Sequence, residues 1–162
     1  MAMMTKVRVG MPGNAAGGSG LSDRMTPDQW VDIFADGKPA LRARFLDGEP
    51  ARLDMYWRAQ VLWDFDGRTW SRGEVRVAGR PPPIRPLSPT LRYEVSLEPN
   101  ERRYLPVLDT TLAAPEGSDL GSDLSVQSDR PVIGLLRYEA VAAVRAEVGV
   151  QLDPREERAA LS

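Results

Sequence analysis

Strict alternation of side-chain character, ending at Asp66-Gly67, is the feature that most constrains the fold of this chain. Successive residues of a β-strand point to opposite faces of the sheet, so alternation over residues 56–65 predicts a strand. Asp-Gly between apolar runs favours a hairpin, because both residues tolerate the positive φ of a type I′ turn. We therefore expect residues 55–70, here named the tryptophan-rich segment, to form one β-hairpin. The odd-numbered face of its first strand carries Trp57, Ala59, Val61, Trp63 and Phe65.

A two-residue loop at Asp66-Gly67 would also set the register of this hairpin. Phe65 would then face Arg68, and Trp63 would face Trp70 on the buried side. Such a cross-strand aromatic pair contributes about 0.5–1 kcal/mol beyond its buried area. Core packing is the usual role of these aromatic residues, and a platform that stacks on a ligand is the alternative. The candidate interaction or structural residues are Tyr56, Trp57, Arg58, Trp63, Asp66, Gly67, Arg68 and Trp70.

The composition excludes several kinds of chemistry. The 162 residues, 42% of them hydrophobic, suit one globular domain with a sizeable core. A formal net charge of −2 provides no basic field for nucleic acid. The chain has no cysteine and no histidine, so it can form neither a Cys–His or Ser–His catalytic pair nor a Cys/His zinc site. No apolar run approaches the roughly 18 residues of a membrane helix, and no cofactor is expected.

Alternation and turn signals along the rest of the chain predict an all-β domain, an antiparallel β-sandwich of about 7–9 strands. One short helix is expected over residues 26–37, where Thr26 and Gln29 form a capping box. The domain is expected to span residues 21–153, after a flexible leader (1–20) and before a linker (154–162) toward a downstream domain. Strands are expected at 41–45, 91–97, 103–108, 132–136 and 137–148, the last despite its many alanines. Pro106 suggests that the strand at 103–108 is an edge strand or contains a bulge.

Two further segments are expected to be irregular. The proline-rich residues 81–89 suit a stiff crossing between sheets, with a polyproline ligand for a partner domain as the alternative. The polar residues 115–130 suit a loop. Its carboxylates could collect a cation, although solvated side chains are the default for such a loop; they are Asp119, Asp123 and Asp129.

The remaining acidic residues indicate no definite site. Asp64-Phe65-Asp66-Gly67 is similar to the start of a calcium loop, but the later ligand positions are missing, which favours a structural turn. Asp64 and Glu74 could act as an acid/base pair, yet their spacing does not determine a distance. A polar patch of Arg58, Gln60 and Asp64 could bind a sugar or could be an ordinary sheet face.

Tyr56-Trp57-Arg58, followed by Phe65-Asp66-Gly67-Arg68-Thr69-Trp70, resembles a signature of bacterial transglutaminase-like membrane proteins. The region that it resembles lies between a block of membrane helices and the transglutaminase core. Weaker similarities occur in the same order along most of residues 21–153; they are at residues 21–27, 41–45, 93–99 and 103–109.

This resemblance implies an extracytoplasmic, non-catalytic domain that packs against or positions a Cys-His-Asp catalytic domain of the same polypeptide. The catalytic Cys and His of the family have no counterpart in this chain, so no catalytic residue can be carried over. The alternatives are a module that binds sugars or peptides of the cell envelope, with its tryptophans as stacking surfaces, and a hydrolase based on carboxylates.

Overall fold

The computed structural model describes residues 5–7, 23–26, 39–72 and 81–149. Within these ranges the fold is all-β, as expected, with fourteen strands in five antiparallel sheets and one 3₁₀ turn, η2 (Arg52–Asp54). The strands exceed the expected number because several predicted strands are divided into shorter ones, and because strands also form at residues 5–7, 84–86, 118–120 and 126–128, where none was expected. Most of the predicted helix at 26–37 lies outside the described residues, and no helix within them is long and apolar enough to cross a membrane.

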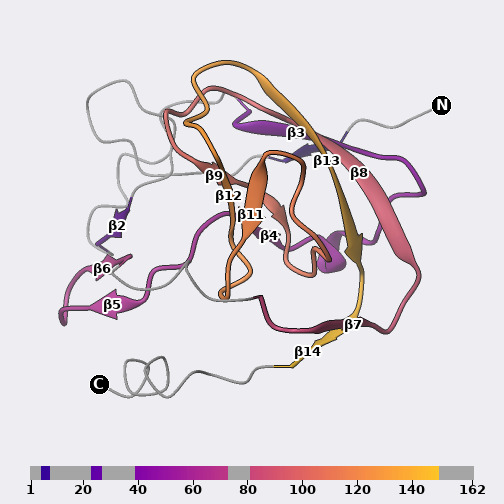
Figure 1. Ribbon diagram of the computed structural model, residues 1–162, viewed down its shortest axis with the longest axis horizontal. Helices are drawn as coiled ribbons and strands as arrows, with labels where there is room; N and C mark the ends of the chain where they lie inside the picture. The colour runs from indigo at the N-terminus through magenta and orange to yellow at the C-terminus, as the bar shows by residue number, and fades with distance from the viewer. Residues whose placement is uncertain (1–4, 8–22, 27–38, 73–80, 150–162) are drawn as a thin grey trace.

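The largest sheet has the strand order β1-β3-β8-β13, and its strands β3, β8 and β13 lie above and to the right of the central short strands in Figure 1. Its members are β1 (Thr5–Val7), β3 (Leu41–Phe45), β8 (Thr90–Leu97) and β13 (Leu136–Ala143). The predicted strands at 41–45 and 91–97 are confirmed, and both bury alternate residues as their sequence pattern predicts.

Cross-strand rows on the inner face of this sheet combine large and small side chains. Phe45 lies opposite Tyr93, and Tyr93 lies opposite Ala140 on the other side. In the next row Ala43, Val95 and Tyr138 are neighbours. The small alanines of the segment 137–148 thus leave room for the Tyr93 ring on the neighbouring strand. This is why an alanine-rich sequence forms a strand here.

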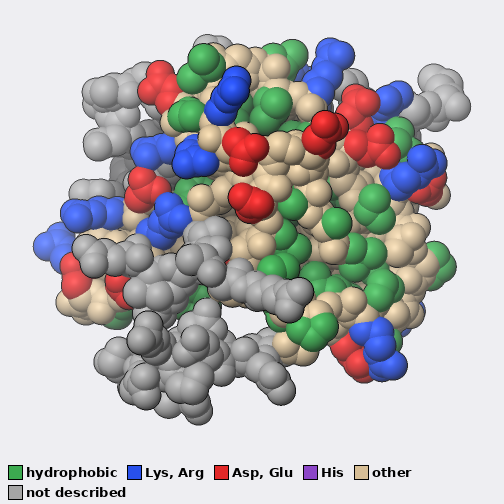
Figure 2. Space-filling view, viewed as in Figure 1, with side chains coloured by type: hydrophobic (Ala, Val, Ile, Leu, Met, Phe, Trp, Pro, Cys, Tyr) green, Lys and Arg blue, Asp and Glu red, His purple; other side chains and the backbone are tan. Residues whose placement is uncertain are grey.

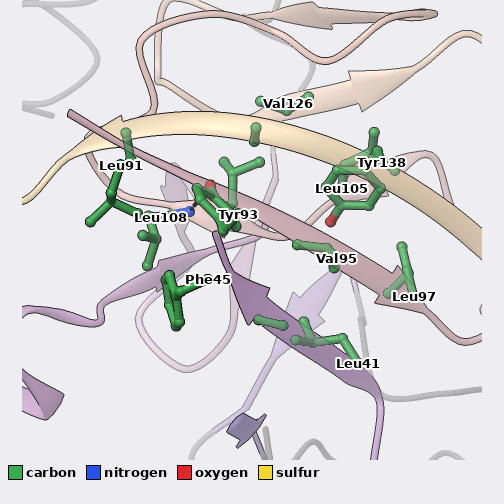
Figure 3. Packing of buried hydrophobic residues seen from close by; sticks show 14 of the residues in the cluster. Leu41, Phe45, Leu91, Tyr93, Val95, Leu97, Leu105, Leu108, Val126 and Tyr138 are labelled. Atoms are coloured by element: carbon green, nitrogen blue, oxygen red, sulfur yellow. Dashed lines mark hydrogen bonds between the residues drawn. The ribbon is translucent and has the colours of Figure 1, made fainter. Parts of the chain in front are cut away.

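A second layer of short strands covers this inner face and completes a sandwich-like core (Figure 3). It contributes the buried residues Leu105, Val107, Leu108 and Val126. The short strands are β4 (Trp57–Arg58), β9 (Tyr104–Leu105), β10 (Val107–Leu108), β11 (Ser118–Leu120) and β12 (Val126–Ser128).

The outer face of the large sheet is charged. Arg42 contacts Glu98 at 2.6 Å, and Arg44 contacts Glu94 at 3.0 Å. These side chains are partly exposed, so each pair contributes at most about 1 kcal/mol. Figure 2 shows basic and acidic side chains interspersed on the visible face of the molecule. This mixture agrees with the small net charge and indicates no extended field of one sign.

Three sequence predictions outside the tryptophan-rich segment are wrong or incomplete. The polar loop predicted at 115–130 contains the β11–β12 hairpin, in which Leu120 pairs with Val126. The predicted strand at 132–136 is a loop up to its last residue. The Val132 carbonyl accepts the N–H groups of Asn100 and Glu101, and Ile133 is 82% exposed. The proline-rich segment contains an edge strand, β7 (Ile84–Pro86), paired with β14 (Ala146–Val148).

The single strand predicted at 103–108, with an edge or a bulge at Pro106, is instead two short strands on either side of this proline. β9 pairs with β12, whereas β10 pairs with β4, so the chain changes sheets at the proline. The hydroxyl of Tyr138 donates a hydrogen bond to the Pro106 carbonyl at 2.6 Å. Burial raises the pKa of this tyrosine well above its ordinary value. The buried hydroxyl therefore stays protonated and holds the change of sheet in place.

Candidate interaction surface

The tryptophan-rich segment is divided between two sheets, which contradicts the prediction of a single hairpin. Its first part, β4, pairs with β10 in the second layer of the core. Its last part forms β5 (Asp64–Phe65) and β6 (Trp70–Ser71), and β6 also pairs with β2 (Arg24–Met25). β2, β5 and β6 lie together at the left of Figure 1, apart from the long strands. The segment therefore links the core to a small peripheral sheet.

The inner part of the segment is anchored by an aromatic and an ionic contact. The Trp57 ring meets the Tyr93 ring edge to face, with centroids 5.6 Å apart. The Arg58 Nε donates to Asp109 Oδ1 at 2.6 Å, and its guanidinium also forms an ion pair with this carboxylate. A second guanidinium nitrogen donates to the Asp123 carbonyl at 3.2 Å. Trp57 thus packs against the core, and Arg58 makes its contacts at the border of the core.

Asp123 is the point at which this segment meets the β11–β12 turn. The Asp123 Oδ1 accepts hydrogen bonds from the backbone N–H of Ser125 at 2.9 Å and from the Ser125 hydroxyl at 2.6 Å. The Trp63 indole N–H makes a longer contact of 3.5 Å with Asp123 Oδ2. The carboxylate is therefore occupied by local donors. No cluster of three possible metal ligands occurs in the described part of the chain.

The β5–β6 hairpin has a four-residue loop, residues 66–69, instead of the predicted loop of two. The Asp66 carboxylate accepts the N–H groups of Arg68 at 2.9 Å and Thr69 at 2.7 Å. Gly67 has a φ of 93°, whereas Asp66 is not in the left-handed region that a type I′ turn requires at both positions. The side chain of Asp66 therefore builds the loop, and the predicted turn does not form.

This longer loop changes which aromatic residues meet. Phe65 pairs with Trp70, so the predicted Trp63–Trp70 and Phe65–Arg68 pairs are wrong. The Phe65 and Trp70 rings stack with centroids 4.7 Å apart and planes 27° apart. Phe65 is 52% exposed and Trp70 is 36% exposed, so this pair lies on the surface instead of in the core. Tyr56 is also exposed, and the polar patch of Arg58, Gln60 and Asp64 does not share one strand.

The hydrogen bonds of Asp66 predict a pH-dependent loop. They hold the pKa of the Asp66 carboxyl below its ordinary value of 3.8, mainly through the Thr69 N–H and then the Arg68 N–H. Because the folded pKa is lowered, the stabilisation is complete above the unfolded pKa and is lost as pH falls through the folded one. NMR titration should show Asp66 titrating below 3.8 together with the Arg68 and Thr69 amide shifts. Asp66→Asn, which keeps the acceptor oxygen, should abolish that titration; a carboxyl that titrates at 3.8 or above would contradict the prediction.

The anchoring partners of Arg58 were not identifiable from the sequence. Asp109 follows a predicted strand, but no local pattern indicates that it faces an arginine 51 positions earlier. The sequence indicates Asp123 only as a possible cation ligand. The pairing of β4 with β10, which brings these residues together, is a long-range contact that alternation alone does not specify.

Together these features define an all-β domain whose border carries an anchored segment and an exposed aromatic pair. Residues 4–148 match the family described as the TgpA N-terminal domain, and the chain belongs to this family. It is 32% identical over 145 residues to a protein-glutamine gamma-glutamyltransferase of Pseudomonas aeruginosa, and the match covers 90% of this chain but 22% of that protein.

Solved structures show the same relationship. The chain is similar to the crystal structure of the periplasmic domain of TgpA from Pseudomonas aeruginosa, with a TM-score of 0.79 and 30% identity. The match covers 89% of this chain and 50% of that one. The ethylmercury-bound form of the same domain gives a TM-score of 0.78 at 29% identity, over 89% of this chain and 51% of that one. The family expected from the signature is therefore confirmed, and the chain spans about a fifth of the curated relative.

Proposed function

We propose that this chain is a non-catalytic, extracytoplasmic domain of a transglutaminase-like membrane protein, and that it packs against and positions the catalytic domain of the same polypeptide. The observation that carries the proposal is the partial coverage of its relatives. The chain matches 22% of the named glutamyltransferase and half of the crystallised periplasmic domain, so each relative contains a large part outside the match.

The residues of the chain support a non-catalytic role beside a separate catalytic domain. The chain has no cysteine and no histidine, the nucleophile and base that the family resemblance implies for the catalytic part. Three of its buried polar side chains instead form hydrogen bonds that hold the core together. Tyr93, Thr111 and Tyr138 bind backbone groups or one another within the core. We therefore assign the chain a structural contribution to the activity of the longer protein.

The proposal is tested with the two-domain portion of the protein, equivalent in extent to the crystallised periplasmic domain of the relative. Transglutaminase activity of this portion is compared with that of the catalytic part alone, and with that of the catalytic part to which this chain is added separately. We expect the catalytic part alone to lose activity or thermal stability, and we expect the added chain to co-purify with it and restore the loss. Absence of association, together with unchanged activity, would contradict the proposal.

A further inference from the structure

The small sheet β2-β6-β5 is amphipathic, and its apolar face is incompletely covered. Antiparallel register places Phe65 opposite Trp70 and Trp70 opposite Met25, so these three residues form one row across the sheet. Residues opposite one another project from the same face. The neighbouring row consists of Asp64, Ser71 and Arg24 and faces the other way. The sheet thus has one apolar face and one polar face, and Phe65 and Trp70 remain exposed on the apolar one.

This aromatic row (Phe65, Trp70 and Met25) is held in place at the base of the small sheet. The Arg72 N–H donates to the Asp23 carbonyl at 3.3 Å, and the Arg72 guanidinium lies 4.9 Å from the centre of the buried Tyr104 ring. The Arg102 guanidinium binds the Asp23 carboxylate at 2.7 Å. Because the sheet is fixed to the domain, little conformational entropy is lost when a partner covers the aromatic row. Rigid aromatic residues surrounded by polar ones are typical of the energetic centre of a protein interface.

Resting on the proposed function, we propose that the aromatic row is the docking surface for the catalytic domain of the same polypeptide. In the crystallised relative, half of the periplasmic chain lies outside the match, so a second folded part of similar size is available as the occupant. The loop beside the row carries one acidic and one basic residue, Asp66 and Arg68, so it presents no cluster of basic residues to an anionic lipid surface. The row belongs to the small sheet at the border of the fold (Figure 1), where Phe65 and Trp70 are partly exposed.

The test uses the two-domain portion with the substitutions Phe65→Ser and Trp70→Ser combined. Leu87→Ser is the matched control, because Leu87 has the same exposed fraction as Phe65, 52%, but lies between β7 and β8. Small-angle scattering measures whether the two domains are docked. We expect a compact wild type, a compact control, and a double variant with a larger radius of gyration and reduced transglutaminase activity. Phe65→Ser alone, at the more exposed position, should give a smaller change in the same direction if the double variant does not fold.

The remaining outcomes distinguish this inference from the proposed function. A compact wild type with an equally compact double variant would overturn the docking surface and leave the proposed function standing. An expanded wild type would overturn both. The wild type and the double variant are also tested for binding to phosphatidylethanolamine and phosphatidylglycerol vesicles, to peptidoglycan fragments and to a second copy of the protein. The inference is wrong if the double variant loses one of these interactions while its two domains stay docked.

Discussion

Replacing Tyr93 with alanine is expected to lower the free energy of unfolding by about 3–5 kcal/mol, which is a large part of the total for a domain of this size. Tyr93 is fully buried, and its ring contacts the rings of Phe45 and Trp57. Removing it leaves a cavity at the junction of the two layers, where β8 faces β4. Urea unfolding of the wild type and the variant, followed by tryptophan fluorescence, measures the difference.

The Tyr93 hydroxyl has an additional effect, which Tyr93→Phe isolates. It accepts the Leu108 N–H at 2.8 Å and lies 3.0 Å from Thr111 Oγ1. Thr111 uses its own proton for the Leu108 carbonyl at 2.7 Å, so the tyrosine donates to the threonine. Loss of the oxygen leaves a buried N–H without a partner, which costs about 1–3 kcal/mol. Tyr56→Phe, at a position 68% exposed, should change stability by less than about 0.5 kcal/mol. Equal effects at both positions would contradict this explanation.

Arg58→Ala is expected to lower the free energy of unfolding by about 2 kcal/mol, because hydrogen bonds to charged groups contribute about 1.5–3 kcal/mol. The guanidinium joins β4 to Asp109 and to the carbonyl of Asp123, and its side chain is only 25% exposed. Its removal weakens the connection between the β11–β12 turn and the tryptophan-rich segment, to which the longer Trp63–Asp123 contact also contributes. Chemical unfolding measures the loss, and proteolysis within residues 121–125 should become faster.

Two comparisons define the origin of this effect. Arg58→Lys keeps the charge but cannot supply the several fixed donors of a guanidinium, so it should recover only part of the stability. Arg44→Ala removes an arginine whose pair with Glu94 is more exposed, and it should cost at most about 1 kcal/mol. If Arg44→Ala were as destabilising as Arg58→Ala, the anchoring role of Arg58 would be wrong.

The long strands were predictable because one face of each is buried in the same core. Alternation at 41–45 and 90–97 is strict, and it identifies both the strands and the buried residues. Even the alanine-rich β13 could be predicted as a strand, although its sequence does not show that Tyr93 needs Ala140 as a neighbour. The all-β fold could therefore be predicted from the alternation of side chains within single strands, because this pattern occurs in several parts of the chain.

The short elements were not predictable, because single side chains and distant partners decide them. The β11–β12 hairpin has only three residues in each strand, which is too short for alternation to show. The apolar run at 132–136 resembles a strand, but its backbone binds the turn at 100–102 instead. In the tryptophan-rich segment, the hydrogen bonds of the Asp66 carboxylate stabilise a longer loop than predicted. The cross-strand partner of Trp70 is therefore Phe65 and not Trp63. The sequence identified the important segment and its family, and the structure corrected which of its residues are exposed.

Hydrogen exchange of residues 64–71 tests most directly whether this domain docks on a catalytic partner through its small sheet. The exchange rates of these amides are compared between the two-domain portion and this chain alone, without the catalytic domain. The amides of β7 and β14 serve as an internal reference. Docking predicts slower exchange of residues 64–71 in the two-domain portion, with the reference strands unchanged. Identical exchange of residues 64–71 in the two proteins would contradict the account.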